Sequence, residues 1–217
     1  MELEKLIAGL VQKVERRFYG KYRGTVVDND DPRKLGRLRA RVPSVLGGEV
    51  VTGWALPCTP YGGDPGLGFL FIPEVGAGIW VEFEEGDLEY PIWTGTFWSA
   101  PGGESEVPKP NKNDPGSEFD EEAEQQSPPT RKIIKTRKGH TIQIEDKDGE
   151  ERIVIIEATN KNMIVMNSDG ITIQDATENK IEMKTDAFTI TAKVDFTIDA
   201  SGKAVKIKGS TVDFEKA

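Results

Sequence analysis

The carboxyl-terminal part of the chain reads Ile181-Glu-Met183, Phe188-Thr-Ile190, Phe196-Thr-Ile198, Val205-Lys-Ile207 and Val212-Asp-Phe214, with polar and small residues between these triplets. Each triplet has the form apolar-x-apolar, so both apolar side chains leave the same face of a β-strand. The triplets start 7, 8, 9 and 7 residues apart, which leaves room only for short strands and tight turns. The pattern predicts a ladder of very short strands with one apolar face.

The same pattern begins upstream, at Ile142/Ile144, Ile153/Ile155 and Ile171/Ile173. One chain with two apolar residues per strand cannot enclose a core, and its outer strands offer unpaired edges to other chains. Three identical chains around a threefold axis solve both problems, so we expect an intertwined homotrimeric β-helix over residues 131–217. The side chains expected to line its axis are Ile181, Met183, Phe188, Ile190, Phe196, Ile198, Val205, Ile207 and Val212.

Residues 19–100 have the character of a small all-β domain. Apolar runs at 22–27, 36–42, 51–56, 69–72, 78–83 and 90–97 are separated by Gly, Pro and Asp. Short strands with such turns indicate a small closed barrel or sandwich, and the size fits an oligonucleotide/oligosaccharide-binding (OB) barrel. The predicted fold class is therefore all-β: an OB-type barrel with a short N-terminal helix, followed by the trimeric β-helix.

Two further segments complete the predicted organisation. Residues 1–18 carry apolar residues at helical spacing, and this helix either packs on its own domain or docks on another subunit. Residues 101–130 are rich in Pro, Gly and acidic residues and carry −6 of the net charge of −9, which indicates an extended linker. The expected domains are the helix 1–18, the barrel 19–100, the linker 101–130 and the spike 131–217.

Three turns should set the register of the barrel strands. Asp31, Pro32 and Gly36 form a tight turn before a strand that begins at Arg37, because proline fixes one backbone dihedral and glycine frees another. Pro73 and Gly76 mark a second turn, and Gly86 and Asp87 a third. The acidic residues of the third turn are expected to be solvated rather than to act as an acid/base pair.

Three ordered blocks carry a resemblance to a known family. They are Asp31-Pro-Arg-Lys-Leu-Gly-Arg-Leu-Arg-Ala-Arg-Val-Pro43, Gly68-Phe-Leu-Phe-Ile-Pro-Glu-Val-Gly76 and Val81-Glu-Phe-Glu-Glu-Gly-Asp-Leu-Glu-Tyr-Pro-Ile-Trp-Thr-Gly95. The series resembles the OB domain of contractile-tail spikes, namely phage baseplate assembly protein V and the VgrG spikes of type VI secretion. Gly139-His-Thr-Ile142, followed by Asp146 to Gly149, is similar to the start of their triple-stranded β-helix.

The resemblance implies a central spike of a contractile injection machine, located in a virion tail baseplate or an equivalent particle. It implies a homotrimer with a separate hub protein at the barrel end, a PAAR-type tip protein at the carboxyl-terminal end and transient contact with the target envelope. The thirty-residue linker leaves no room for the lysozyme domain of some phage spikes. A rod of this kind acts mechanically, so its function would be stiffness.

Little in the sequence favours catalysis, a cofactor or a metal site. His140 is the single histidine, which rules out a His-x-His metal tip and indicates a structural turn residue. Asp146, Asp148 and Glu150 lack the later glutamate of a calcium loop and are expected in a charged hairpin turn. Cys58 is the only cysteine and is expected to be a small buried residue. Without a signal peptide or a long apolar run, we expect synthesis in the bacterial cytoplasm without export by a general signal.

An alternative is a binding module or a receptor- or carbohydrate-binding fibre. Its aromatic face would consist of Tyr22, Trp54, Trp80, Trp93 and Trp98, as in barrels that stack bases or sugars. The domain is net acidic and has a basic row only at Arg37, Arg39 and Arg41, so no nucleic-acid partner is expected. The neighbours of Trp80 and Trp93 are apolar, which favours a core position for at least some of these aromatic residues.

Overall fold

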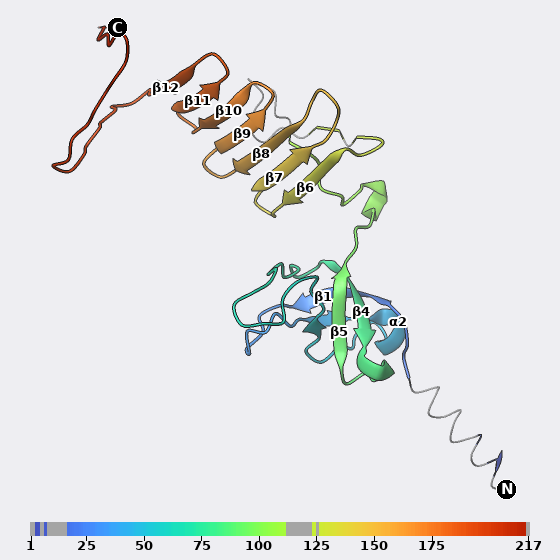
Figure 1. Ribbon diagram of the computed structural model, residues 1–217. Helices are drawn as coiled ribbons and strands as arrows, with labels where there is room; N and C mark the ends of the chain where they lie inside the picture. The colour runs from blue at the N-terminus through green and yellow to red at the C-terminus, as the bar shows by residue number, and fades with distance from the viewer. Residues whose placement is uncertain (1–2, 5–6, 8–16, 112–122, 125, 216–217) are drawn as a thin grey trace. The chain divides into compact units, whose positions relative to one another are not determined.

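The computed structural model describes residues 3–4, 7, 17–111, 123–124 and 126–215 and divides into two units, Met1–Val107 and Pro108–Ala217 (Figure 1). The predicted helix at 1–18 lies mostly outside the described residues, and so does part of the predicted linker at 101–130. A search of the described ranges for a helix able to cross a membrane finds none.

The first unit is a curled five-stranded sheet in the order β2-β1-β4-β5-β3. Isolated bridges from Leu38 to Ala55 and from Arg41 to Val51 draw the two ends of the sheet toward closure. This arrangement confirms the predicted OB-type domain. The elements are β1 (Tyr22–Asp28), β2 (Arg39–Arg41), α2 (Pro43–Leu46), β3 (Leu56–Pro57), β4 (Gly78–Phe83), η1 (Glu84–Gly86), β5 (Pro91–Thr96) and η2 (Pro101–Gly103).

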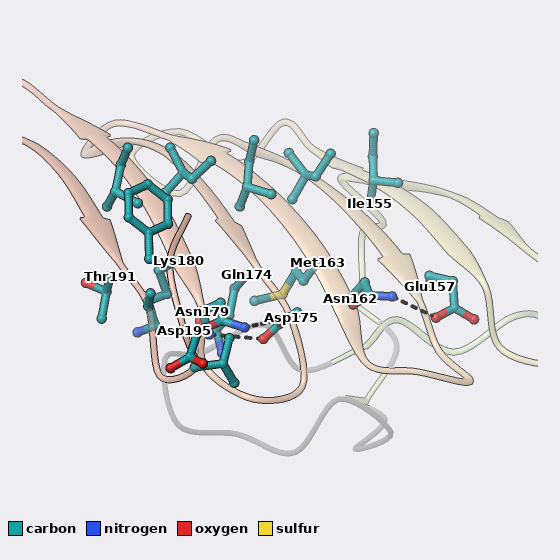
Figure 2. Close-up of a pocket in the computed structure, with 17 residues that line it drawn as sticks. Ile155, Glu157, Asn162, Met163, Gln174, Asp175, Asn179, Lys180, Thr191 and Asp195 are labelled. Atoms are coloured by element: carbon teal, nitrogen blue, oxygen red, sulfur yellow. Dashed lines mark hydrogen bonds between the residues drawn. The ribbon is translucent and has the colours of Figure 1, made fainter. Parts of the chain in front are cut away.

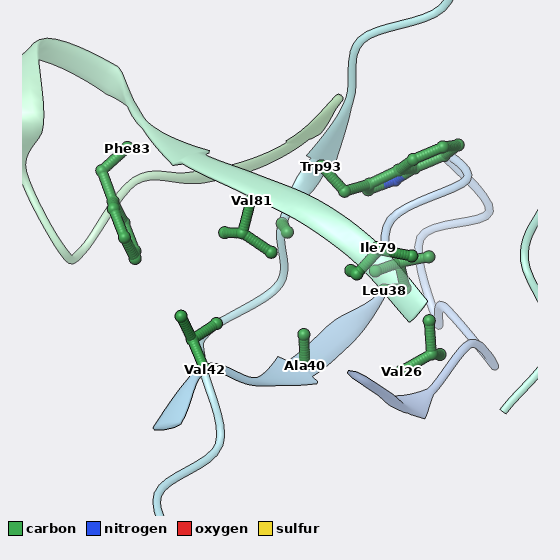
Figure 3. Close-up of a cluster of buried hydrophobic side chains, with 9 residues drawn as sticks. Val26, Leu38, Ala40, Val42, Ile79, Val81, Phe83 and Trp93 are labelled. Carbon is green, nitrogen blue, oxygen red and sulfur yellow. The ribbon is translucent and has the colours of Figure 1, made fainter. Parts of the chain in front are cut away.

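The core of this unit follows from strand alternation. On β4, Ile79, Val81 and Phe83 are buried while the residues between them are half-exposed. Trp93 of β5 lies in the same core, and its indole N–H donates to the carbonyl of Gly36 at 3.1 Å. Figure 3 shows these side chains converging with four from β1, β2 and the segments beside β2. The cluster is Val26, Leu38, Ala40, Val42, Ala55, Ile79, Val81, Phe83 and Trp93.

Two expectations for the first unit are wrong. Residues 69–72 form no strand, because Gly68, with φ of 144°, and Pro73, which has no N–H to donate, bound a loop without a strand partner. Cys58 is exposed rather than buried. Its backbone N–H is bonded to the carbonyl of Trp93 at 2.9 Å, which fixes the backbone beside β5 while the side chain faces solvent.

The second unit is a seven-stranded antiparallel sheet in which sequence order equals spatial order. Its strands are β6 (Arg131–Lys135), β7 (Thr141–Glu145), β8 (Arg152–Glu157), β9 (Asn162–Asn167), β10 (Gly170–Gln174), β11 (Lys180–Lys184) and β12 (Phe188–Thr191). Gly170 opens β10 with φ of 132°, and a Cβ there would lie 2.0 Å from the carbonyl oxygen of Met183. Only glycine fits this turn, and the ladder of short strands is confirmed over residues 131–191.

Beyond Thr191 the expected ladder does not continue. Residues 192–215 are described and contain no strand, so the triplets at 196–198, 205–207 and 212–214 are not in strands. A strand requires a neighbour that supplies backbone hydrogen bonds. The described segments of one chain place no such neighbour beyond β12.

Candidate functional site

The front face of the second unit carries two rows of apolar side chains that cross the strands in register. The isoleucine row consists of Ile134, Ile142, Ile155, Ile164, Ile173, Ile181 and Ile190. The mixed row consists of Ile144, Ile153, Met166, Ile171, Met183 and Phe188. Together we call these rows the apolar face. Strand alternation puts one residue of each row on every strand from β7 to β12.

The apolar face is partly open to solvent in the single chain. Exposure is 39% at Ile155 and Ile173 and reaches 65% at Phe188. On β7 to β11, neighbouring strands already cover both flanks of each side chain, so the open part is the surface that points away from the sheet. A continuous apolar surface of this size on a soluble protein marks an interaction site.

The structure brings four of the predicted axial residues together. Ile181 faces Ile190 and Met183 faces Phe188 across β11 and β12. Whether they line an axis stays a prediction. The other five, Phe196, Ile198, Val205, Ile207 and Val212, lie in the strandless segment and are exposed.

Three members of the apolar face were missed in the sequence. Ile164-Val-Met166 is itself an apolar-x-apolar triplet, so the same signal could have identified it. Its signal was weakened because the neighbouring Met163 and Val165 are also apolar. Ile134 follows another isoleucine in β6, and the residue of β6 that lies opposite Ile144 of the mixed row is Lys132. β6 therefore carries no apolar-x-apolar triplet that would identify Ile134.

A groove of about 630 Å³ runs beside the ends of β8 to β12 (Figure 2). Five isoleucines of the isoleucine row, from Ile155 to Ile190, line it, and Val194 and Phe196 of the following segment complete it. In the turn between β10 and β11, the amide of Asn179 donates to Asp175 at 2.7 Å. The pKa of Asp175 is lowered chiefly by this bond and by the hydroxyl of Thr177, so its carboxylate is held as a turn residue.

The opposite face of the sheet is partly covered by residues that precede β6. Thr141, Gln143 and Glu145 of β7 are buried, and so are Val154 and Ile156 of β8. The backbone N–H of Asn111 donates to the side chain of Gln143 at 3.1 Å, and Gln126 donates to Glu145 at 2.8 Å. Residues from the predicted linker segment therefore attach to the back of the first strands.

Glu145 is the best-buried carboxylate of the molecule's described part, with 1% of its surface exposed. Burial raises the pKa of this group, but donors from Thr130, Arg131, Gln126 and the backbone of Lys147 outweigh burial and lower the pKa to about 2. The guanidinium of Arg131 lies 2.5 Å from the carboxylate. The group is thus a charged structural anchor between β6, β7 and the preceding segment.

The barrel turns lie where the sequence indicated. Asp31 accepts from the backbone N–H groups of Arg33 and Leu35, and its carboxylate pairs with Arg37 at 2.5 Å. The Arg37 hydrogen bond holds the pKa of Asp31 well below its usual range. Pro32 and Gly36 lie within this turn, and Gly36 has φ of 70°. The Asp31 carboxylate thus holds the turn closed through backbone hydrogen bonds and its pair with Arg37, which fits the predicted role of this motif in folding.

The other two turns are held by both backbone and side-chain contacts. The carbonyl of Pro73 accepts from Asn29 at 3.0 Å, and the N–H of Gly76 donates to Val26 at 2.9 Å. At Gly86, φ is 75° and a Cβ would lie 3.0 Å from the backbone nitrogen of Phe18. Asp87 pairs with Arg17 at 3.1 Å.

The five aromatic residues of the alternative binding face divide among different environments. Trp93 is in the core, Tyr22 packs against Phe18 and Phe83, and Trp98 is exposed. The remaining two each contact arginine: Trp54 lies under Arg37 and Arg39, and Trp80 under Arg23. The basic row is likewise engaged, since Arg37 pairs with Asp31 and Arg39 donates to the carbonyl of Thr52.

The polar turns of the sheet match their predicted positions. His140 lies between β6 and β7, and its Nδ1 accepts from the backbone N–H of Ala158 at 3.2 Å. Asp146, Asp148 and Glu150 lie in the hairpin turn between β7 and β8, where Lys147 and Glu150 form an ion pair. Both assignments as turn residues are confirmed.

Comparison with known families matches both units. Residues 22–98 match the injector OB domain of type VI secretion systems and phage baseplates, and residues 132–194 match the phage baseplate V C-terminal trimerisation domain. A search of curated proteins finds no match. The two domains assign a baseplate injector role in a tail baseplate or injection particle and self-association as a homotrimer. They cover well over half of the residues, and the chain therefore belongs to the phage baseplate V family of VgrG-like spike proteins.

Proposed function

We propose that the protein is a non-enzymatic central spike, a rigid homotrimeric rod that is driven into the target envelope when the sheath of an injection machine contracts. It links a hub protein at the barrel end to a PAAR-type tip protein at the carboxyl-terminal end. The observation that carries the proposal is the apolar face, whose two rows cross the sheet without a polar interruption from β7 to β12.

The apolar face supplies the association energy that such a rod requires. Full burial of a large aliphatic side chain is worth about 1.5–3 kcal/mol. Ten of the thirteen side chains of the two rows are between 37% and 65% exposed in the single chain, and the other three are half-buried. The thirteen side chains of the two rows thus contribute on the order of 10 kcal/mol per chain before the entropy cost of association. Three sheets with these faces turned inward would form a continuous apolar interior.

Stiffness follows from the same arrangement. Every strand from β7 to β11 is hydrogen-bonded to neighbours on both sides, so bending the sheet would disrupt many bonds together. At about 4.8 Å between strands, the seven strands span roughly 29 Å along the rod. A close-packed interior has low compressibility, which suits a part that transmits force along its length.

The carboxyl-terminal segment supports the proposed tip partner. Residues 192–215 contain three apolar-x-apolar triplets but no strand. Strand edges supplied by the other two chains would extend the rod through these triplets, and any such rod exposes strand edges where its strands stop. A tip protein that covers those edges completes the rod.

The pKa values of the described carboxyl groups support a role without catalysis. Each carboxyl group with a shifted pKa is shifted downward, namely Asp31, Glu106, Glu145, Glu157 and Asp175. A carboxyl that acts as a general acid near neutral pH requires the opposite shift. These five carboxylates are thus held as charged groups in structural contacts. We also propose that the chain is synthesised in the bacterial cytoplasm before it is assembled into the particle.

The test is a puncture assay with intact injection particles. Particles assembled with the wild-type chain should release dye from vesicles of target envelope when the sheath contracts. Particles prepared with the Ile173→Lys chain, which should not form the trimeric rod, should contract without release, while particles prepared with the back-face control Thr172→Lys should behave as wild type. Equal dye release from both variants would contradict the mechanical role.

A further inference from the structure

The first unit displays an apolar loop whose exposure its own fold does not explain. This apolar loop, residues 61–71, lies between β3 and β4. It presents five large apolar side chains that are each more than half exposed, namely Tyr61, Leu67, Phe69, Leu70 and Phe71. Leu70 reaches 82% exposure. The run that includes Phe69 to Phe71 has the composition of a buried strand, yet it pairs with none.

Contacts within the apolar loop hold its two sides together despite its exposure. The ring of Phe69 packs against Tyr61 with centroids 5.8 Å apart and against Phe71 at 6.2 Å. The N–H of Phe69 donates to the carbonyl of Tyr61 at 3.1 Å. A Cβ at Gly68 would lie 3.0 Å from the same carbonyl, so the two sides of the loop meet closely. A pre-ordered surface loses little entropy when a partner covers it.

The exposed area is large enough for a stable contact between copies. A large aromatic side chain can bury about 150–250 Å² of accessible surface. The exposed parts of the three aromatic and two leucine side chains together amount to roughly 500–600 Å² of accessible surface. This is at the upper limit for the largest apolar patch of a typical monomer. Counted on both partners, contact would bury roughly 1,000–1,200 Å² per loop, near the lower limit for a specific interface.

The chain itself brings copies of the barrel together. The segment after β5 is attached to the first unit, since Glu106 accepts from the backbone N–H and hydroxyl of Ser99 at 2.7 and 2.6 Å. Asn111 is attached to Gln143 of the second unit. The connection between residues 106 and 111 therefore reaches at most roughly 18 Å when fully extended. Once the trimerisation domains have joined, three barrels share a small volume at millimolar effective concentration.

We propose that the apolar loop of each barrel packs against the barrel of a second copy in the homotrimer, so that the trimer is closed at the barrel level as well as through the sheets. The contact rests on the homotrimeric state of the proposed spike. In a threefold assembly it is heterologous: each loop covers a different surface of the next barrel, and three such contacts close a ring. Asp64 within the loop makes insertion into an anionic membrane unfavourable.

Hydroxyl-radical footprinting of the full-length protein tests this contact, because it measures side-chain exposure directly. Tyr61 and Tyr90 are matched probes on the same unit, with exposures of 56% and 61% in the single chain. In the wild-type trimer Tyr61 should oxidise at least fivefold more slowly than Tyr90. In the dissociated Ile173→Lys protein the two rates should become similar, and the mass of each sample is measured in parallel.

Equal oxidation of the two tyrosines in a sample whose mass is that of a trimer would overturn the loop contact and leave the spike proposal standing. The loop would then be open to a different protein or to lipid. A wild-type mass of one chain would instead overturn the homotrimer, and the contact with it. The double variant Phe69→Ser, Leu70→Ser provides a second readout: its trimer should persist through the sheets, with Tyr61 oxidised at the rate of Tyr90.

Discussion

A single positive charge in the middle of the apolar face should prevent trimer formation. Ile173 lies in β10, flanked in register by Ile164 and Ile181, and 39% of it is exposed in the single chain. In the proposed trimer this remaining surface would be covered, so Ile173→Lys would bury an ammonium group among isoleucine side chains. An uncompensated buried charge costs about 3–5 kcal/mol, which amounts to roughly 9–15 kcal/mol over three chains.

Such a loss lowers the association constant by about six to eleven orders of magnitude. The matched control is Thr172→Lys, one residue away on the opposite face, where Glu182 lies opposite in register and can pair with the new charge. Sedimentation equilibrium between 1 and 50 μM should find one chain for the Ile173 variant and three chains for the control. Two trimers of equal stability would refute the assignment of the apolar face as the association surface.

Other substitutions address the anchors and the carboxyl-terminal triplets. Because the folded-state pKa of Glu145 is lowered from 4.5 to about 2, the stability it contributes is complete above pH 4.5 and is lost as the pH falls toward 2. In thermal melts, the free energy of unfolding of the wild type should therefore exceed that of Glu145→Gln by about 3 kcal/mol at pH 7 and by almost nothing at pH 2. A difference in unfolding free energy that does not change with pH would disprove this linkage. Asp31→Ala should lower the melting temperature of the barrel more than Asp30→Ala does, since Asp31 carries the Arg37 pair and the turn bonds; equal effects in calorimetry would argue against the anchor. Phe196→Ala should cost about 2–5 kcal/mol per chain, or roughly 6–15 kcal/mol per trimer, and weaken assembly before it alters the barrel; an equally heat-resistant trimer would show that Phe196 does not line the axis.

Strand alternation made much of the fold predictable. Whether two side chains share a strand face depends only on their separation in the sequence, so Ile181/Met183 and Phe188/Ile190 could be assigned to one face without knowledge of the fold. The same reasoning holds for the barrel, where Ile79 and Val81 face the core and Trp80 does not.

Features that depend on partners or on distant residues could not be predicted in this way. The strand pattern continues to Phe214, but a strand also needs a neighbour, and the part of the chain that the structure describes supplies none beyond β12. The apolar run at 69–72 has strand composition, yet it forms an exposed loop. Glu145 looks like an ordinary solvent-facing strand residue, because the segment that buries it lies in a stretch whose composition indicated a linker.

The central claim is that three copies associate through residues 131–217, and the mass of the protein in solution tests it most directly. Light scattering during size-exclusion chromatography should give about three times the chain mass of 23.9 kDa for the full-length protein. The chain without residues 131–217 should elute at the mass of a single truncated chain at the same micromolar concentration. A full-length protein that is monomeric, or a truncated one that remains fully trimeric, would contradict the account.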